Sequence, residues 1–170
     1  RQDVEDYLAS HAPAPAASAP AASNATAPTD GPVVLITGAS GDIGQAIARK
    51  FAAAGARLAL QYHQNLAAAE ALQADLRATG ATVHLLAADL RDSAAAGELA
   101  TQVQTHYGRL DVLVHNAGSL QDGLVSFMSD EQWHEVMALN LNAGFYLART
   151  AAMIMARQRR GKLLFITSDA

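Results

Sequence analysis

The chain has 170 residues, 51% of them hydrophobic, which is enough to fill the core of about one domain and excludes a chain that is disordered throughout. Its formal net charge of −4 disfavours a nucleic-acid partner, and the absence of cysteine excludes disulfides and thiolate metal sites. There is no signal-peptide pattern and no uninterrupted apolar stretch of membrane-spanning length, so we expect a cytoplasmic protein without a membrane partner.

The first 31 residues differ in composition from the rest. Residues 12–31 are rich in alanine and proline, which predicts a semi-rigid linker. Residues 1–11 carry Val4, Tyr7 and Leu8 at helical spacing, which is compatible with the end of an upstream element and equally with a frayed polar end. The chain begins at Arg1 and stops just after an apolar run, so we expect it to be a window of a longer protein.

From residue 32 onward, two kinds of segment alternate. Short apolar runs rich in branched residues predict strands buried on both faces, at 33–37, 57–63, 81–87, 110–115 and 162–167. Alanine-rich stretches with helical periodicity lie between them, at 42–54, 64–79, 92–107 and 130–159. This alternation predicts an α/β fold with a doubly wound parallel sheet, a three-layer αβα Rossmann fold that ends after its fifth strand.

Residues at the ends of these segments support the assignment. Gly55 and Gly80 stand where a helix needs a left-handed cap, and Ser129 to Gln132 has the spacing of a capping box. The last helical region is about thirty residues long, so we expect it to bend or to consist of two pieces. Its apolar flank is expected to pack in the core, or in part against a second subunit, and comprises Trp133, Met137, Leu141, Phe145 and Ala148.

The stretch TGASGDIG, residues 37–44, lies between the first predicted strand and the first predicted helix. Glycines at such a turn allow main-chain N–H groups and the positive end of the helix to approach a diphosphate without interference from Cβ atoms. A purely structural glycine turn is the alternative. The predicted cofactor-binding residues here are Gly38, Ser40, Gly41, Asp42, Ile43 and Gly44.

Two further segments end strands that should open onto the same sheet edge. Asp89 and Leu90 follow the third strand, where the carboxylate can accept a hydrogen bond from an adenine amino group. Asn116, Ala117 and Gly118 follow the fourth strand, where small side chains leave room for a ribose and a nicotinamide. We expect these five residues to bind the cofactor as well.

With these motifs in place, residues 32–170 resemble the short-chain dehydrogenase/reductase family, and most of all its 3-oxoacyl-[acyl-carrier-protein] reductase branch. The family fingerprint TGxxxGxG falls on residues 37–44, its adenine-site aspartate on Asp89 and its NAG motif on residues 116–118. Its active-site asparagine falls on Asn140, within ALNLNAGF, and its catalytic serine on Ser168, within LLFITSDA.

The fingerprint departs from the family at one position. The second family glycine falls on Asp42, and Gly41 takes the preceding place, so that the spacing is TGxxGxxG. A carboxylate that faced the phosphates would repel them. We therefore expect Asp42 to point away and to cap the helix start, with Gly41 providing the close approach.

The resemblance implies hydride transfer between a nicotinamide and a carbonyl or alcohol carbon. It assigns Ser168 a hydrogen bond to the substrate oxygen and Asn140 a water in the proton relay. The family's general acid, a tyrosine followed four residues later by a lysine, is absent from these 170 residues and would fall just beyond Ala170. The chain as given is therefore expected to bind cofactor weakly and not to turn over.

The segment after the second strand, Gln61 to Asn65, contains no acid that could hold the ribose hydroxyls of NADH. This favours NADPH (NADP) over NADH (NAD). His63 is placed either beside the 2′-phosphate or as an ordinary loop residue, and no arginine is placed there. The six histidines show no paired ligand spacing, so no metal site is expected.

Two functions remain open from the sequence. The first is a reductase of a 3-oxoacyl thioester or another small ketone, acting on a small-molecule or carrier-bound acyl substrate and forming a homo-oligomer at full length. The second is a non-catalytic dinucleotide-binding module within a larger polypeptide. The stretch RQRR at residues 157–160, with its three arginines, favours a solvated helix end over a docking site for an acidic carrier.

Overall fold

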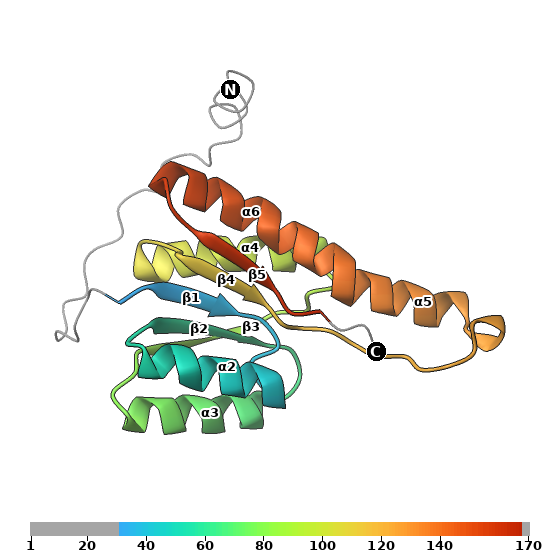
Figure 1. Ribbon diagram of the computed structural model, residues 1–170, viewed down its shortest axis with the longest axis horizontal. Helices are drawn as coiled ribbons and strands as arrows, with labels where there is room; N and C mark the ends of the chain where they lie inside the picture. Colours follow the sequence, from blue (N-terminus) through green and yellow to red (C-terminus); the bar gives the residue numbers. More distant parts are fainter. Residues whose placement is uncertain (1–30, 168–170) are drawn as a thin grey trace, which may run out of the picture.

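The computed structural model describes residues 31–167, so the predictions for the upstream element, most of the linker and Ser168 lie outside the described residues. Five strands alternate with the helices (Figure 1). The strands are β1 (Val33–Ile36), β2 (Arg57–Tyr62), β3 (Val83–Ala87), β4 (Val112–His115) and β5 (Lys162–Phe165). The α-helices are α2 (Asp42–Ala53), α3 (Leu66–Ala78), α4 (Ser93–Tyr107), α5 (Asp130–Met137) and α6 (Ala143–Gln158).

All strand pairs are parallel, in the order β3-β2-β1-β4-β5. In the register, Leu35 of β1 lies opposite Ala59 of β2 on one side and Leu113 of β4 on the other. The first strand, β1, lies in the middle of the sheet, and from there the chain runs outward to β3 and then returns to β4. The strand order therefore reverses between β1 and β4, and ligands bind in α/β sheets beside the carboxyl ends of strands at this kind of reversal.

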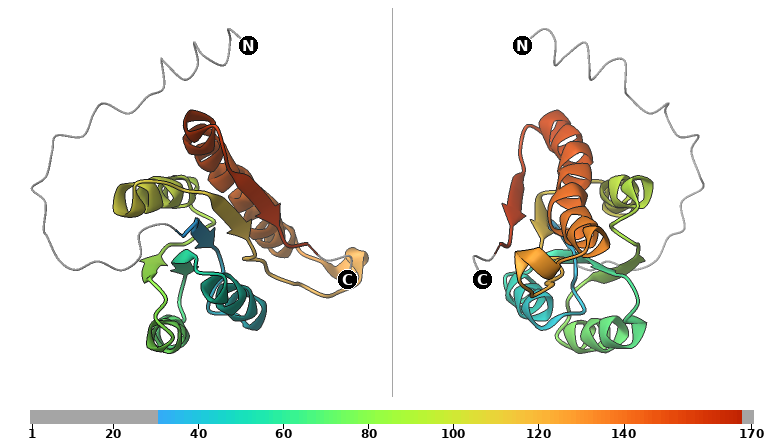
Figure 2. Two further views of the ribbon diagram at one scale, coloured as in Figure 1. Left: turned by 60° about the vertical axis from the view of Figure 1, so that its left-hand side comes forward. Right: turned by 90° about the vertical axis from the view of Figure 1, so that its right-hand side faces the viewer.

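Helices cover both faces of the sheet, which confirms the predicted three-layer fold (Figure 2). Along β1, Val33 and Leu35 belong to the core cluster with α4 and α6, whereas Val34 and Ile36 belong to the cluster with α2 and α3. Alternate side chains of a strand point to opposite faces. This is why the central strands read as continuous apolar runs rather than as an alternating pattern.

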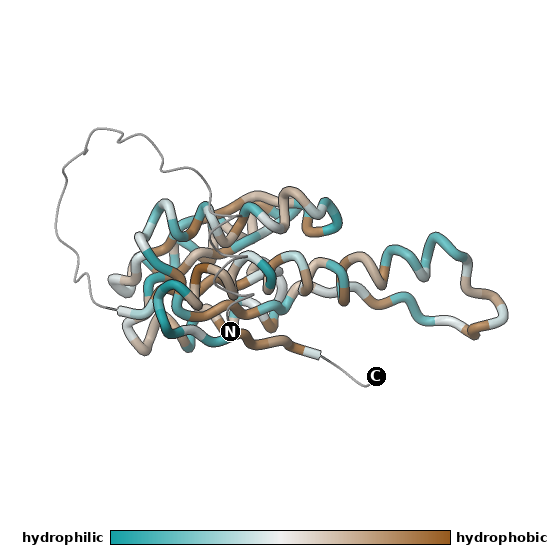
Figure 3. Tube along the Cα trace, turned by 90° about the horizontal axis from the view of Figure 1, so that it is seen from above, coloured by the Kyte–Doolittle hydropathy of each residue, from teal (hydrophilic) through white to brown (hydrophobic). Residues whose placement is uncertain are grey.

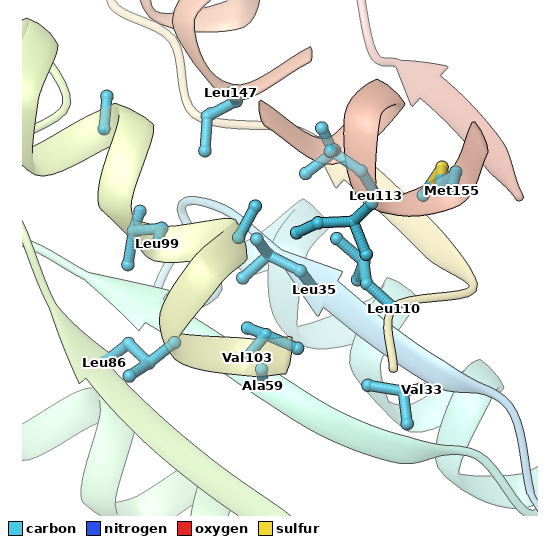
Figure 4. Packing of buried hydrophobic residues seen from close by; sticks show 14 of the residues in the cluster. Val33, Leu35, Ala59, Leu86, Leu99, Val103, Leu110, Leu113, Leu147 and Met155 are labelled. Atoms are coloured by element: carbon cyan, nitrogen blue, oxygen red, sulfur yellow. The ribbon is translucent and has the colours of Figure 1, made fainter. Parts of the chain in front are cut away.

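The core beneath α4 and α6 joins large strand residues to helices that are rich in alanine. Leu35 and Leu113 pack there with Leu99, Val103 and Leu147, all fully buried (Figure 4). Burial of one leucine side chain contributes about 1.5–3 kcal/mol. The alanines on the facing sides of the two helices, Ala96, Ala100, Ala143 and Ala151, are also fully buried and let the helices approach the sheet and each other closely.

The predicted helix ends are confirmed. Gly55 and Gly80 have φ of +77° and +88°, and Ser129 forms a capping box with Gln132 at the start of α5. The thirty-residue helical region consists of two pieces, because a π-helical turn, Ala138–Asn142, separates α5 from α6. None of the helices in residues 31–167 is long and apolar enough to cross a membrane.

The predicted core role of the apolar flank is wrong for its three largest side chains. Trp133, Leu141 and Phe145 are 54%, 58% and 59% exposed. The face of α6 that meets the sheet carries a different set of residues at helical spacing, namely Ala143, Leu147, Ala151 and Ile154. The loop before α5 and α5 itself also extend away from the body of the molecule (Figure 1 and Figure 3).

Strand β5 is present as predicted, but its burial differs from the prediction. All four of its residues are exposed, whereas β1 is fully buried. The reason is position: within residues 31–167, β5 is at the edge of the sheet and pairs with β4 alone.

Candidate functional site

An open pocket of about 790 Å³ lies at the carboxyl ends of β1, β2, β3 and β4. Every residue predicted from the sequence to bind a cofactor lines it, although these residues come from four separate segments. The lining also includes six residues for which the sequence predicted no role, namely Gln61, Gln64, Asn65, Arg91, Glu135 and Leu139. The structure therefore gathers the predicted set at the point where the strand order reverses.

The three glycines of residues 37–44 occupy their positions for different structural reasons. Gly38 has φ of +62°, and a Cβ there would lie 2.9 Å from the Ala117 Cα. A Cβ on Gly44 would overlap the Gly38 carbonyl oxygen and lie 2.8 Å from the Ala39 Cα. The close packing of the protein's own backbone thus accounts for both.

Gly41 is different, because a Cβ there would meet only the Gly38 carbonyl oxygen, at an ordinary 3.6 Å. Gly41 is the N-cap of α2, and no side chain caps this helix. By contrast, Asn65, Asp92 and Ser129 accept hydrogen bonds from the first turns of α3, α4 and α5. The start of α2 thus leaves main-chain N–H groups and open space facing the pocket.

The predicted cap by Asp42 is wrong. Asp42 is the first residue of α2 rather than the residue before it, so its side chain cannot take the N-cap position. It is exposed and contributes to the lining of the pocket.

Thr37 joins the glycine turn to the end of β4. Its buried hydroxyl oxygen accepts hydrogen bonds from the main-chain N–H groups of Asn116 at 3.0 Å and Ala117 at 3.1 Å. The Asn116 side chain donates in return to the carbonyl oxygens of Thr37 and Gly38, both at 3.2 Å. These bonds join the segment predicted to hold the diphosphate to the segment predicted to border the ribose and nicotinamide.

Gln61 performs a similar task on the other side of β1. It is 1% exposed, accepts a hydrogen bond from the Gly38 N–H at 2.8 Å and donates one to the Ala88 carbonyl at 2.8 Å. One amide side chain therefore connects the ends of β1, β2 and β3. An acid at position 61 would lose one of these two bonds, because a carboxylate cannot donate the second.

His115 is buried directly beneath this junction. Its Nδ1 lies 3.1 Å from the Thr37 hydroxyl, which already accepts two N–H groups and must therefore donate its proton. Nδ1 is then the acceptor, and the proton of the neutral ring is on Nε2. Among the described residues Nε2 has no hydrogen-bond partner. Burial lowers the pKa of His115, and the nearby Leu139 carbonyl opposes this only in part.

This tautomer can be tested by nitrogen NMR of the protein labelled at histidine. We expect the Nε2–H form of His115 to persist below pH 6.5, the ordinary pKa of histidine. Because the folded-state pKa is lowered, the stability that His115 contributes is present above about pH 6.5 and is lost as the pH falls toward the folded value. In urea unfolding, the free energy of unfolding of His115→Asn should fall less than that of the wild type as the pH is lowered below about 6.5. An Nδ1–H tautomer would contradict the assignment.

Asn140 lies in the π-helical turn between α5 and α6. Its Oδ1 accepts from the Ser119 N–H at 2.8 Å, and its Nδ2 donates to the Ser119 carbonyl at 2.9 Å. The side chain therefore holds the loop after β4 against the turn, a contact that the sequence did not predict. π-helical turns occur often at functional sites. The expected neighbour of Asn140 in catalysis, Ser168, is outside the described residues.

A group of charged side chains lies where the ends of β2 and β3 meet. Arg91 donates from Nε at 2.9 Å and from Nη2 at 2.8 Å to the two carboxylate oxygens of Asp89. The hydrogen bond from this guanidinium lowers the pKa of Asp89 to about 2. His63 Nε2 lies 3.6 Å from the same carboxylate, and Arg91 Nη1 lies 3.7 Å from Glu135 of α5.

The sequence predicted no role for Arg91, because no arginine lies near His63 in the segment after the second strand, Gln61 to Asn65. The available signal was the position of Arg91 two residues after Asp89, at the end of a neighbouring strand. Within residues 31–167, no three His, Cys, Asp or Glu side chains come together in a way that could hold a metal ion.

Comparisons with known proteins agree with this geometry. Residues 32–170 match the family model described as short chain dehydrogenase. The chain is 34% identical over 141 residues to 2,3-dihydro-2,3-dihydroxybenzoate dehydrogenase of Bacillus subtilis, covering 83% of this chain and 54% of that protein. It is 35% identical over 138 residues to 3-oxoacyl-[acyl-carrier-protein] reductase of a Synechocystis strain, covering 81% and 56%.

The solved structures include a metagenomic short-chain oxidoreductase in complex with NADP. It matches with a TM-score of 0.76 and 37% identity, over 81% of this chain and 62% of that one. The chain spans little more than half the length of the curated relatives described above.

Proposed function

The chain belongs to the short-chain dehydrogenase family, and from this premise we propose that the protein is an NAD(P)H-dependent oxidoreductase acting on a carbonyl or an alcohol. One observation carries the proposal. The residues of four sequence segments line a single pocket at the reversal point of the sheet, and the start of α2, which no side chain caps, faces that pocket through Gly41. A bound nicotinamide would supply the hydride, and the chain would hold and orient it.

Different residues of the pocket would hold different parts of the proposed ligand. The N–H groups at the start of α2 would hold the diphosphate, with Gly41 leaving room for it. Asp89 and Leu90 would hold the adenine, and Asn116 to Gly118 would border the ribose and nicotinamide. The Thr37 and Gln61 hydrogen bonds would keep these parts in register.

We propose NADPH as the preferred cofactor. The end of β2, from Gln61 to Asn65, carries no carboxylate that would repel a 2′-phosphate, and His63 lines the pocket there. The related metagenomic oxidoreductase was solved with NADP, which supports the same choice.

We propose a 3-oxoacyl thioester, attached to a carrier protein or to coenzyme A, as the substrate. The relatives include a 3-oxoacyl-[acyl-carrier-protein] reductase, and the family resemblance assigns Asn140 and Ser168 to the active site. A dihydrodiol dehydrogenase is about equally similar, so a cyclic alcohol is the second substrate class. The exposed flank with Trp133, Leu141 and Phe145 favours a homo-oligomer, because apolar patches of this kind are often interfaces.

The test uses the full-length protein, purified and mixed with NADPH and acetoacetyl thioester, with NADPH consumption followed by absorbance. We expect NADPH binding and thioester-dependent NADPH oxidation, and binding without turnover for residues 1–170 alone. Binding without NADPH-dependent reduction of an acetoacetyl thioester or a small ketone, and without oxidation of a cyclic dihydrodiol by NADP+ or NAD+, would favour the alternative, a non-catalytic dinucleotide-binding module. Absence of nicotinamide binding would overturn both functions.

A further inference from the structure

The charges around the pocket do not suit an anionic ligand at first sight. Three carboxylates line it, those of Asp42, Asp89 and Glu135. Arg91 is the one lysine or arginine in the lining, and His63 carries charge only when protonated. A dinucleotide with several phosphate charges would meet a net negative surface unless these carboxylates are compensated.

Arg91 compensates two of the three. Its guanidinium pairs with both oxygens of Asp89 and also faces Glu135 across the pocket. The paired geometry fixes where the Asp89 oxygens point, because a guanidinium and a carboxylate meet as two planar forks. With a pKa of about 2, Asp89 is ionised at any neutral pH, so its charge can be balanced only by a neighbouring cation.

We propose that Arg91 is a specificity-determining and positioning residue, which neutralises Asp89 and Glu135 so that the adenosine end of the pocket accepts a 2′-phosphorylated nucleotide. The inference rests on the proposed function, since it concerns the same pocket. It assigns Arg91 a role through Asp89 and through the local field, rather than through a direct bond to phosphate. If Arg91 has this role, its replacement lowers the affinity for a ligand more strongly when the ligand carries the 2′-phosphate.

Two small ligands isolate this end of the pocket, adenosine 2′,5′-bisphosphate and adenosine 5′-monophosphate, which differ only in the 2′-phosphate. Titration calorimetry on the full-length protein compares wild type with Arg91→Ala. We expect the bisphosphate to lose about tenfold or more in affinity and the monophosphate about threefold or less, because the two uncovered carboxylates repel the added phosphate. Arg91→Lys, which keeps the charge, should recover most of the bisphosphate affinity.

The matched control is Arg49→Ala, because Arg49 makes an exposed ion pair with Asp75 at 3.1 Å and does not line the pocket. It should leave both affinities unchanged. Adding Asp89→Asn to Arg91→Ala should restore much of the bisphosphate binding, which a purely structural role of Arg91 would not produce. Equal losses for the two ligands, or no loss, would overturn the inference while leaving the proposed function standing. A wild type that binds neither ligand would overturn both.

Discussion

Replacing Gly44 with alanine is expected to lower the free energy of unfolding by about 2–3 kcal/mol, the cost of forcing an extra carbon into a packed interior. The added Cβ would overlap the Gly38 carbonyl oxygen and lie 2.8 Å from the Ala39 Cα and 3.0 Å from the Asn116 Nδ2. Two of these three atoms are backbone, so the turn itself must shift. Because the same turn faces the pocket, NADPH binding should be lost as well. Urea unfolding and a nicotinamide fluorescence titration measure the two effects.

Gly41→Ala is the matched control, since its Cβ meets nothing in the protein closer than 3.6 Å. An N-cap glycine replaced by alanine costs about 1 kcal/mol or less. Stability should therefore be nearly kept, while NADPH affinity falls because the methyl group occupies the space proposed for the diphosphate. Wild-type stability of Gly44→Ala would contradict the geometry of the turn. Wild-type affinity of Gly41→Ala would contradict the placement of the diphosphate.

The residues that line the pocket could be predicted from the sequence because of where they stand relative to the strands. Residues 37–44, 89–90 and 116–118 all follow predicted strands, and parallel strands bring their carboxyl ends to one edge of the sheet. The pattern of predicted strands is therefore sufficient to predict that these segments lie close together. The pattern could not predict which glycine serves the protein's own packing and which leaves room for a ligand, because this depends on how the turn folds back on itself and packs against residues 116 and 117.

Long-range contacts account for the other differences. Arg91 and Glu135 meet across the pocket although they are far apart in the chain, so no local motif indicates their pairing. Asn140 was predicted from a family motif, but its two bonds to Ser119 depend on how the π-helical turn faces the loop after β4. The exposure of Trp133 has a similar cause: helical spacing identifies an apolar face but not which face meets the sheet.

Among substitutions in the site that preserve side-chain size, Thr37→Val should cause the largest loss of stability. Valine keeps the shape of threonine but removes the oxygen that accepts from the N–H groups of Asn116 and Ala117 and the proton donated to His115. Thr37 is fully buried, so water cannot replace these bonds. Each buried polar group left unpaired costs about 1–3 kcal/mol, so the total loss should reach about 3 kcal/mol or more. Urea unfolding measures the loss.

Thr37→Ser separates the hydroxyl from the methyl group. Serine keeps the oxygen, so this variant should lose only about 1 kcal/mol, the contribution of one buried methyl group. It should also keep the Nε2–H tautomer of His115 in nitrogen NMR, whereas Thr37→Val should leave Nδ1 without its donor and change that signal. If Thr37→Val destabilises the protein no more than Thr37→Ser does, the hydroxyl does not hold β1 and β4 together, and the tautomer assigned to His115 loses its basis.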